Sequence, residues 1–254
     1  MGCRSRALRP LLLVGLIAAL CAISGCRAWP GRPVVSTIEV AGAEAVDTEP
    51  LLDGLATTET PLLFGLIPRV LEYSTYDPAV LAKDLERVER FLRARGYYEA
   101  KVSAARVVRL DKHRVRVEID VALGAPVHVR RVNPAGLALL PIELAAPAVS
   151  SIRMREGDVF DEQSFADDKR ALQRVLTDGG YAFAKVEAKA QVDIAKHAVD
   201  VNYSVQLGPR ARYGLVRIDG LGEIPEEPVR ATLHIRPGEL YSSADLEDGR
   251  KALV

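Results

Sequence analysis

The residues of this chain that could perform catalysis or bind a metal are dispersed along the sequence. No two of its histidines have metal-ligand spacing such as His-Glu-x-x-His. We expect all four histidines to be solvated, and two of them fall in predicted hairpin turns. The four are His113, His128, His197 and His234. Asp167 and Asp168 form a carboxylate pair, but they fall on a predicted amphipathic helix beside Lys169-Arg170. We therefore expect this pair to belong to a charged outer helix face.

The glycine motifs of the chain also do not match those of nucleotide-binding or catalytic sites. Gly220-Leu221-Gly222 is too short for a dinucleotide fingerprint, which requires a third glycine at the start of a helix. The sequence contains no Gly-x-Ser-x-Gly nucleophile motif and no Walker loop. We therefore expect no catalytic residue, no cofactor and no metal ligand, and we expect the protein not to be an enzyme.

Thiol chemistry is confined to the N-terminus, which excludes a disulfide framework elsewhere. All three cysteines lie there: Cys3, Cys21 and Cys26. Three arginines precede an apolar run, Leu11 to Ile23, that is too short to span ~30 Å of hydrocarbon but suits a signal peptide. The run ends in Ile23-Ser24-Gly25-Cys26, which resembles the bacterial lipobox. Cys26 is expected to be acylated after residues 1–25 are removed. The alternative is an ordinary signal peptide cut at the small residues.

The composition describes an ordinary folded chain. Of 254 residues, 34 are basic and 34 acidic, so the formal net charge is zero. This balance argues against a nucleic-acid surface, which would be strongly basic. Aromatic residues make up 6% of the chain, too few for base-stacking platforms. With 48% hydrophobic and 27% charged residues, the chain is neither disordered nor a polytopic membrane protein.

A tandem repeat organises the remaining sequence. Residues 96–102, Gly-Tyr-Tyr-Glu-Ala-Lys-Val, recur 84 positions later as residues 180–186, Gly-Tyr-Ala-Phe-Ala-Lys-Val. The same offset relates Leu123-Gly124 to Leu207-Gly208, and a similar one relates residues 155–160 to residues 236–241. Several pairs in one order indicate repeated structural units rather than chance.

Each unit is predicted to begin with a short strand followed by two helices. The strands, each closed by a glycine, are residues 37–40, 127–132 and 213–218. The first helices are residues 49–55, 142–150 and 227–233. In the first unit Asp77 is a natural N-cap before Pro78, and Gly96 ends the second helix. Apolar residues at helical spacing then form one face of that helix: Leu81, Leu85, Val88 and Leu92.

A β-hairpin completes the first two units. Residues 114–123 and 198–207 alternate apolar and polar side chains with a period of two, which predicts strands with one buried face. Their predicted partners are residues 100–110 and 184–192, joined through turns at 111–113 and 195–197. Each unit therefore has the order β-α-α-β-β, with two helices on one face of a small sheet.

The helix followed by Gly-Tyr-x-x-Ala-Lys-Val, a Leu-Gly pair and a strand closed by glycine resembles the polypeptide-transport-associated (POTRA) domain. Such domains stand in series in the periplasm ahead of outer-membrane barrels of the BamA/TamA type. The resemblance covers about residues 34–254. It implies an α+β fold of tandem β-α-α-β-β units, each a three-stranded mixed sheet with two helices on one face.

The predicted organisation has five parts. They are a signal peptide (1–25), a linker after Cys26 (26–33), unit 1 with an apolar insertion at 58–76 (34–126), unit 2 (127–210) and unit 3 (211–254). Unit 3 stops part-way along its second helix, so we expect the chain to be a fragment of a longer protein. A barrel, if present, is expected beyond Val254.

We expect the edges of the sheets to be the binding surfaces of the protein. The edge of a three-stranded sheet carries unpaired N–H and C=O groups. In the resembled domains an unfolded client adds a strand to such an edge, which supplies affinity without demanding one sequence. The alternative is that neighbouring units cover these edges. The candidate residues lie in the first hairpin strands: Lys101, Val102, Ala104, Val108, Lys185, Val186, Ala188 and Val192.

The apolar insertion of unit 1 is a second candidate surface. Long loops in compact domains are often functional, and an exposed apolar patch suggests a protein or membrane contact. The alternative is that its side chains fold back as local core. The candidate contact residues are Leu62, Leu63, Phe64, Leu66 and Ile67.

The resemblance implies a non-enzymatic role in the cell envelope of a Gram-negative-type bacterium. The units would bind unfolded outer-membrane or exported polypeptides and deliver them to an outer-membrane β-barrel, with the acyl anchor on the membrane. Arg27 stands where an aspartate favours inner-membrane retention in some bacteria, which points to the periplasmic face of the outer membrane. The alternatives are a two-partner secretion transporter, an envelope scaffold lipoprotein, or a periplasmic enzyme whose catalytic domain lies beyond Val254.

Overall fold

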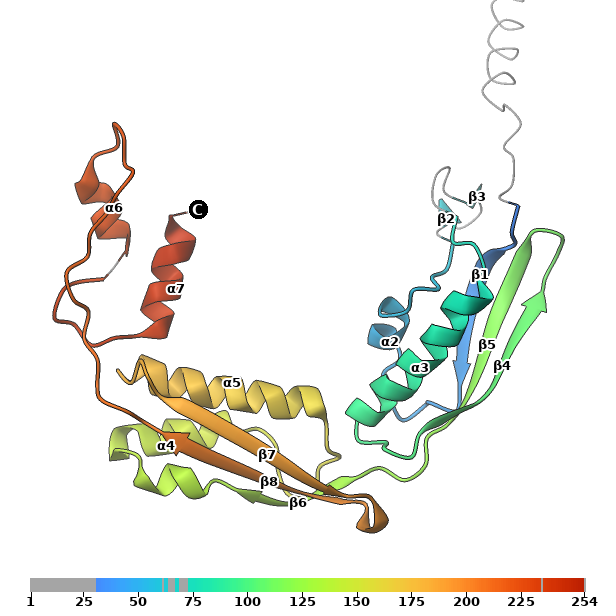
Figure 1. Ribbon diagram of the computed structural model, residues 1–254, viewed down its shortest axis with the longest axis horizontal. Coiled ribbons are helices and arrows are strands. Elements are labelled where there is room, and N and C mark those ends of the chain that lie inside the picture. The colour runs from blue at the N-terminus through green and yellow to red at the C-terminus, as the bar shows by residue number, and fades with distance from the viewer. Residues whose placement is uncertain (1–30, 61, 64–66, 69–72, 234, 254) are drawn as a thin grey trace, which may run out of the picture.

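The computed structural model describes residues 31–60, 62–63, 67–68, 73–233 and 235–253 (Figure 1). Cys26, Phe64, Leu66 and His234 lie outside the described residues. Within the described part of the chain, no helix has the length and apolar character that crossing a membrane requires.

The first unit consists of a three-stranded sheet with two helices on one face (Figure 1). Its sheet has the order β1-β5-β4, in which β1 runs parallel and β4 antiparallel to the central strand. A short antiparallel pair, β2 with β3, lies between the two helices in sequence. The elements are β1 (Val34–Ala41), α2 (Glu49–Asp53), β2 (Leu62–Leu63), β3 (Ile67–Pro68), α3 (Pro78–Ala94), β4 (Lys101–Arg109) and β5 (Arg114–Ala122).

The second unit repeats this plan with the sheet order β6-β8-β7. Here β6 is parallel and β7 antiparallel to β8. The elements are β6 (His128–Asn133), η1 (Ala135–Leu139), α4 (Ile142–Ser151), α5 (Glu162–Asp178), β7 (Lys185–Asp193), η2 (Ile194–Lys196) and β8 (Ala198–Gln206). The predicted α+β fold with mixed three-stranded sheets is confirmed.

The third group of elements is helical in the described residues. It contains α6 (Glu226–Leu233) and α7 (Ser243–Ala252), whose N-cap Ser242 accepts a hydrogen bond from the Asp245 N–H. The strand predicted at residues 213–218 is wrong, since only an isolated bridge joins Arg212 to Leu240 there. In the first two units the opening strand pairs with the last hairpin strand, and the described residues offer residues 213–218 no such partner.

Local capping explains where the long helices begin. The Asp77 side chain accepts a hydrogen bond from the Ala79 N–H at 2.9 Å, and Asp161 accepts one from the Ser164 N–H at 2.6 Å. Each carboxylate satisfies a backbone donor that the first helical turn leaves without a partner. The buried faces of α3 and α5 then pack on the inward side chains of the sheets and form two separate cores.

Asp168 corrects the prediction of a charged outer helix face. Asp167 is exposed and pairs with Arg170, but Asp168 is 2% exposed. Its two carboxylate oxygens accept hydrogen bonds from the backbone N–H groups of Arg153 and Met154, both at 2.9 Å. One repeat earlier, the buried Asp84 accepts two backbone N–H groups of the segment after α2 in the same way. Both residues fix the end of the first helix onto the second.

The joints between successive units are also repeated. The Val127 N–H donates to the Gly96 carbonyl at 2.9 Å, and the Ala211 N–H donates to the Gly180 carbonyl at 2.7 Å. Gly96 has a φ of 88°, and a Cβ at this position would lie 2.3 Å from the Phe160 carbonyl oxygen of the next unit. Only glycine allows this close approach, because any side chain would collide with that oxygen.

Candidate functional site

Each three-stranded sheet has two edges, and the two edges differ. The parallel strands β1 and β6 form one edge, and the antiparallel strands β4 and β7 form the other. The candidate residues of the sequence therefore lie on strands that are edge strands in the structure. Unpaired backbone groups on such strands are potential sites for an added strand.

The chain itself occupies outward backbone groups near the start of β1 and of β6. The Val35 N–H donates to the Ser74 carbonyl at 2.8 Å, and the Val35 carbonyl accepts from Thr60 at 2.9 Å. In the second unit the Val129 N–H donates to Asp158 at 2.8 Å, and the Val129 carbonyl accepts from the Gly157 N–H at 2.8 Å. These contacts occupy backbone groups that an added strand would need, so the start of β1 and of β6 is a poor acceptor for one.

The edge formed by β7 is regular along its whole length. β7 pairs with β8 from Lys185 to Asp193 without a register shift. The Val186 N–H points away from β8, because it donates to the side chain of Gln173 at 3.1 Å. Hydrogen-bonding direction alternates along an antiparallel strand. The backbone groups that point outward are therefore those of Ala188, Ala190 and Val192, and no hydrogen bond to another described segment occupies them.

The edge formed by β4 is interrupted by a bulge at Ser103. The register changes between Val102 and Ala104, and the Ser103 hydroxyl donates to the Asp120 carbonyl at 3.0 Å. Beyond the bulge, Ala104 pairs with Asp120 and Val108 with Arg116. These β5 residues direct their backbone groups toward β4, as Arg114 does when it accepts from the Leu110 N–H. Ala104 and Val108 therefore direct their N–H groups inward. The outward positions are instead Ala105, Val107 and Arg109. The two repeats therefore present different edges despite their equal length.

The candidate residues at the start of each strand do not offer open donors. Lys101 and Lys185 are exposed, but their positions in the pairing direct their N–H groups toward β5 and β8. The Val102 N–H donates to the Glu89 carboxylate at 3.1 Å, as the Val186 N–H does to Gln173. Of the eight candidates, Ala188 and Val192 alone have outward N–H donors that no other described segment accepts.

The insertion of unit 1 is described in part. Leu62 pairs with Pro68 and Leu63 with Ile67 in the short antiparallel pair of β2 and β3. Phe64 and Leu66 lie outside the described residues. The base of the insertion lies beside the start of β1, because Val34 and Thr75 form an antiparallel bridge.

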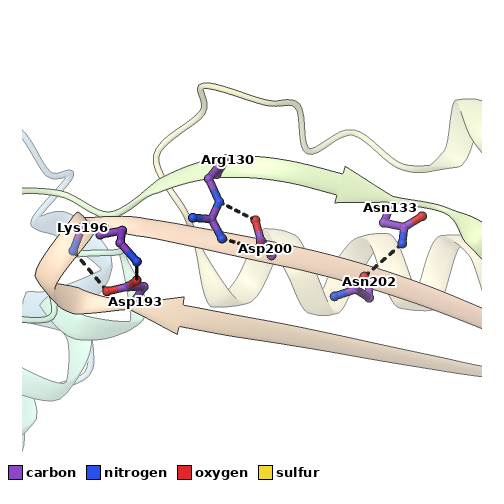
Figure 2. Close-up of polar contacts among 6 residues, drawn as sticks. All are labelled: Arg130, Asn133, Asp193, Lys196, Asp200 and Asn202. Atoms are coloured by element: carbon purple, nitrogen blue, oxygen red, sulfur yellow. Dashed lines mark hydrogen bonds and ion pairs between the residues drawn. The ribbon is translucent and has the colours of Figure 1, made fainter.

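The exposed face of the second sheet satisfies its own polar groups (Figure 2). The Arg130 guanidinium makes two hydrogen bonds to Asp200 across β6 and β8, one of them at 2.9 Å. Asn133 donates to Asn202 at 3.2 Å on the same face. The hydrogen bond from Arg130 holds the pKa of Asp200 below its ordinary value. This face is polar and internally paired, unlike the outer side of β7.

Two of the described histidines are backbone neighbours, because the His128 N–H donates to the His197 carbonyl at 2.9 Å. His128 lies in β6, not in a turn, and its Nδ1 is 3.0 Å from the Gly157 carbonyl oxygen. His197 lies in the turn after η2 with a φ of 45°, and its Nδ1 is 3.9 Å from the Glu99 carboxylate of the first unit. Within the described ranges, no group of three or more His, Cys, Asp or Glu residues could hold a metal ion.

Sequence comparison identifies the repeated unit. The profile of the POTRA family, described as surface antigen variable number repeat, matches residues 33–124 and 148–208, more than half of the chain. The chain belongs to the POTRA family. The two matched segments fall within the two units that contain the sheets, so β4 and β7 are the outer hairpin strands of two POTRA units.

Relatives of these POTRA units include outer-membrane assembly factors. The chain is 26% identical over 222 residues to the outer membrane protein assembly factor BamA of Buchnera aphidicola, covering 86% of the chain and 34% of that protein. It is 25% identical over 186 residues to a putative outer membrane protein assembly factor of Treponema pallidum, covering 70% and 22%. The chain therefore spans about a third or less of the length of these relatives.

A solved structure shows the same fold. The crystal structure of Haemophilus influenzae BamA POTRA3-5 superposes with a TM-score of 0.52 at 22% identity, covering 87% of this chain and 84% of that one.

Sequence reasoning missed the polar side chains that the helices direct to buried backbone groups. Asp168 and Gln173 both looked like ordinary polar residues of an amphipathic helix. The repeat offset carries the signal, because it aligns Asp84 with Asp168 and Glu89 with Gln173, so each unit keeps a hydrogen-bonding side chain at both positions.

Proposed function

We propose that these POTRA units bind extended segments of unfolded outer-membrane or exported polypeptides and deliver them to an outer-membrane β-barrel. One observation carries the proposal: the chain itself occupies outward backbone groups near the start of β1 and β6, whereas the outward groups of β7 from Ala188 to Val192 have no hydrogen bond to another described segment. The names of the relatives supply the kind of client, since those proteins are described as outer membrane protein assembly factors.

Recognition through backbone groups suits a carrier of many clients. An added strand pairs with the N–H and C=O groups of Ala188, Ala190 and Val192, whatever its own sequence. The side chains of these residues are small and partly buried on the helix side of the sheet, so they do not obstruct the edge. This role involves no bond making or breaking, and we propose that the protein is not an enzyme.

The location follows from the same proposal. We place the units in the periplasm of a Gram-negative-type bacterium, with Cys26 acylated and anchored in the outer membrane. Thr75, near the end of the insertion, forms a bridge with Val34 at the start of β1, and Val34 follows Cys26 by eight positions in the sequence. We propose that the apolar residues of the insertion contact the membrane or the barrel.

Proline substitution tests the binding mode. Ala188→Pro with Ala190→Pro removes two outward N–H donors and leaves the β7–β8 ladder intact, because proline is tolerated where the N–H faces away from the sheet. At about 1 kcal/mol for each lost hydrogen bond, photo-cross-linking to an unfolded outer-membrane polypeptide should need roughly thirtyfold more client. The full chain is used, and amide exchange in the core checks folding.

The matched control changes side chains on the same strand and keeps every backbone donor. Lys189→Ala with Gln191→Ala alters two exposed residues of β7 and should cross-link like the unchanged chain. If the proline variant binds normally, or the control loses binding to the same extent, recognition does not rest on the backbone edge and the proposal fails.

A further inference from the structure

The side chain of Gln173 occupies the first outward position of the β7 edge. Its Oε1 accepts the Val186 N–H at 3.1 Å, and its Nε2 donates to the Ala184 carbonyl at 2.7 Å. These are the two hydrogen bonds that a neighbouring strand would make at this level of the sheet. A helix-borne amide therefore stands in for one residue of an added strand.

The first unit has a related arrangement 84 residues earlier. Glu89, one repeat before Gln173, accepts the Val102 N–H through Oε1 at 3.1 Å. Its second oxygen accepts from Arg93 at 2.8 Å, which holds the carboxylate in place. Ionised glutamate has no donor for the preceding carbonyl, so the first unit reproduces one of the two bonds.

We propose that Gln173 is a register stop, a side chain that fixes where a client strand begins on β7. The inference rests on the proposed function and defines the site more narrowly. A client cannot accept the Val186 N–H unless it displaces the Oε1 of Gln173, so the first N–H donor open to it is that of Ala188. Pairing therefore starts at Ala188, with the strand running toward the hairpin turn.

The turn closes the other end of the site. η2 follows β7 directly, and the Asp193 side chain holds the turn by accepting from the Lys196 N–H at 3.2 Å and from its ammonium group at 2.8 Å. Between Gln173 and this turn, the outward residues are Ala188, Ala190 and Val192. A client strand that pairs with them is about five residues, or roughly 17 Å, long. The site thus selects a short extended segment in one register, with little demand on its sequence.

The first unit is the poorer receptor for such a segment. The bulge at Ser103 directly follows the Glu89 contact and breaks the even spacing of outward groups. A straight client strand cannot follow both sides of a bulge with one register. We therefore place the register stop on β7, where the outward groups follow the Gln173 contact without a bulge.

Amide hydrogen exchange on the full chain tests the stop with a defined probe, a capped synthetic peptide that alternates valine and threonine. Without peptide, the Val186 amide should exchange roughly fivefold more slowly than those of Ala188 and Ala190, from one hydrogen bond of about 1 kcal/mol. Peptide should slow exchange at Ala188, Ala190 and Val192 and leave Val186 unchanged. In Gln173→Ala the Val186 amide should lose its protection and then gain it when peptide is added.

Two further variants keep the test decisive. Gln173→Glu retains the acceptor for Val186 and should keep the stop, even if the alanine variant does not fold. Gln163→Ala removes an exposed glutamine of the same helix, whose amide donates to Asp167, and should leave the footprint unchanged.

The outcomes separate the stop from the proposed function. If peptide protects Val186 in the unchanged chain, or the footprint is the same in Gln173→Ala, the register stop is wrong while strand addition stands. If peptide protects no β7 amide in any variant, strand addition itself is wrong and the stop falls with it.

Discussion

Replacing the buried Asp168 by alanine is expected to destabilise the second unit by about 3–5 kcal/mol. The carboxylate accepts the N–H groups of Arg153 and Met154, each at 2.9 Å, and Met154 is 5% exposed. A hydrogen bond to a charged group contributes about 1.5–3 kcal/mol, and a buried donor left without a partner loses that stabilisation in full. Two such bonds sum to about 3–6 kcal/mol, and the expected loss lies below the upper end because the bond to the Arg153 N–H is only part-buried.

The adjacent residue provides the control. Asp167→Ala removes a carboxylate of similar helix propensity that is exposed and pairs with Arg170 at the surface. Exposed ion pairs contribute little, so its effect should stay within about 0.5 kcal/mol. Asp168→Asn keeps one oxygen as an acceptor and should lose roughly half of the stabilisation that Asp168→Ala loses.

The free energies of unfolding are to be measured by urea titration of the full chain. Because successive units need not unfold together, amide exchange at the buried Leu172 should report the second core separately. An Asp168→Ala effect no larger than that of Asp167→Ala would refute the reasoning, since it would mean that the two backbone donors do not depend on this carboxylate.

Three further outcomes are expected. Burial alone would raise the pKa of Asp84, but the hydrogen bonds that its carboxylate accepts lower this pKa overall. The stabilisation that the ionised carboxylate gives to the folded state should therefore be lost as pH falls below about 4. In Asp84→Asn, a plot of the urea midpoint against pH should be flatter in that range. Gly96→Ala should cost about 1–3 kcal/mol and change the angle between units in small-angle scattering, because its Cβ would lie 2.3 Å from the Phe160 oxygen; an unchanged profile would contradict this. Arg95→Ala removes a half-exposed ion pair with Asp161 and should cost less than about 1 kcal/mol without altering that angle; a larger change would show that the ion pair sets the joint.

Local chemistry determined the elements of this protein from the sequence. Asp77 and Asp161 are caps because a short acceptor side chain satisfies the first backbone donors of a helix, wherever the helix lies. The alternation in residues 114–123 and 198–207 predicted the central strands, since a half-buried strand must expose every second side chain. The repeat then predicted that the same α+β unit occurs twice, as the two sheets confirm.

Tertiary structure alone decided which backbone groups are buried, paired or open. Asp168 looks like Asp167 in sequence, yet its position one residue on turns it toward the end of α4, where two donors lack other partners. The bulge at Ser103 and the amide of Gln173 likewise depend on contacts between strands and helices distant in the chain. A pattern specifies the face of an element on which a side chain lies. Which partner meets that face is set by packing, and packing is what leaves the outer side of β7 open between Gln173 and the turn.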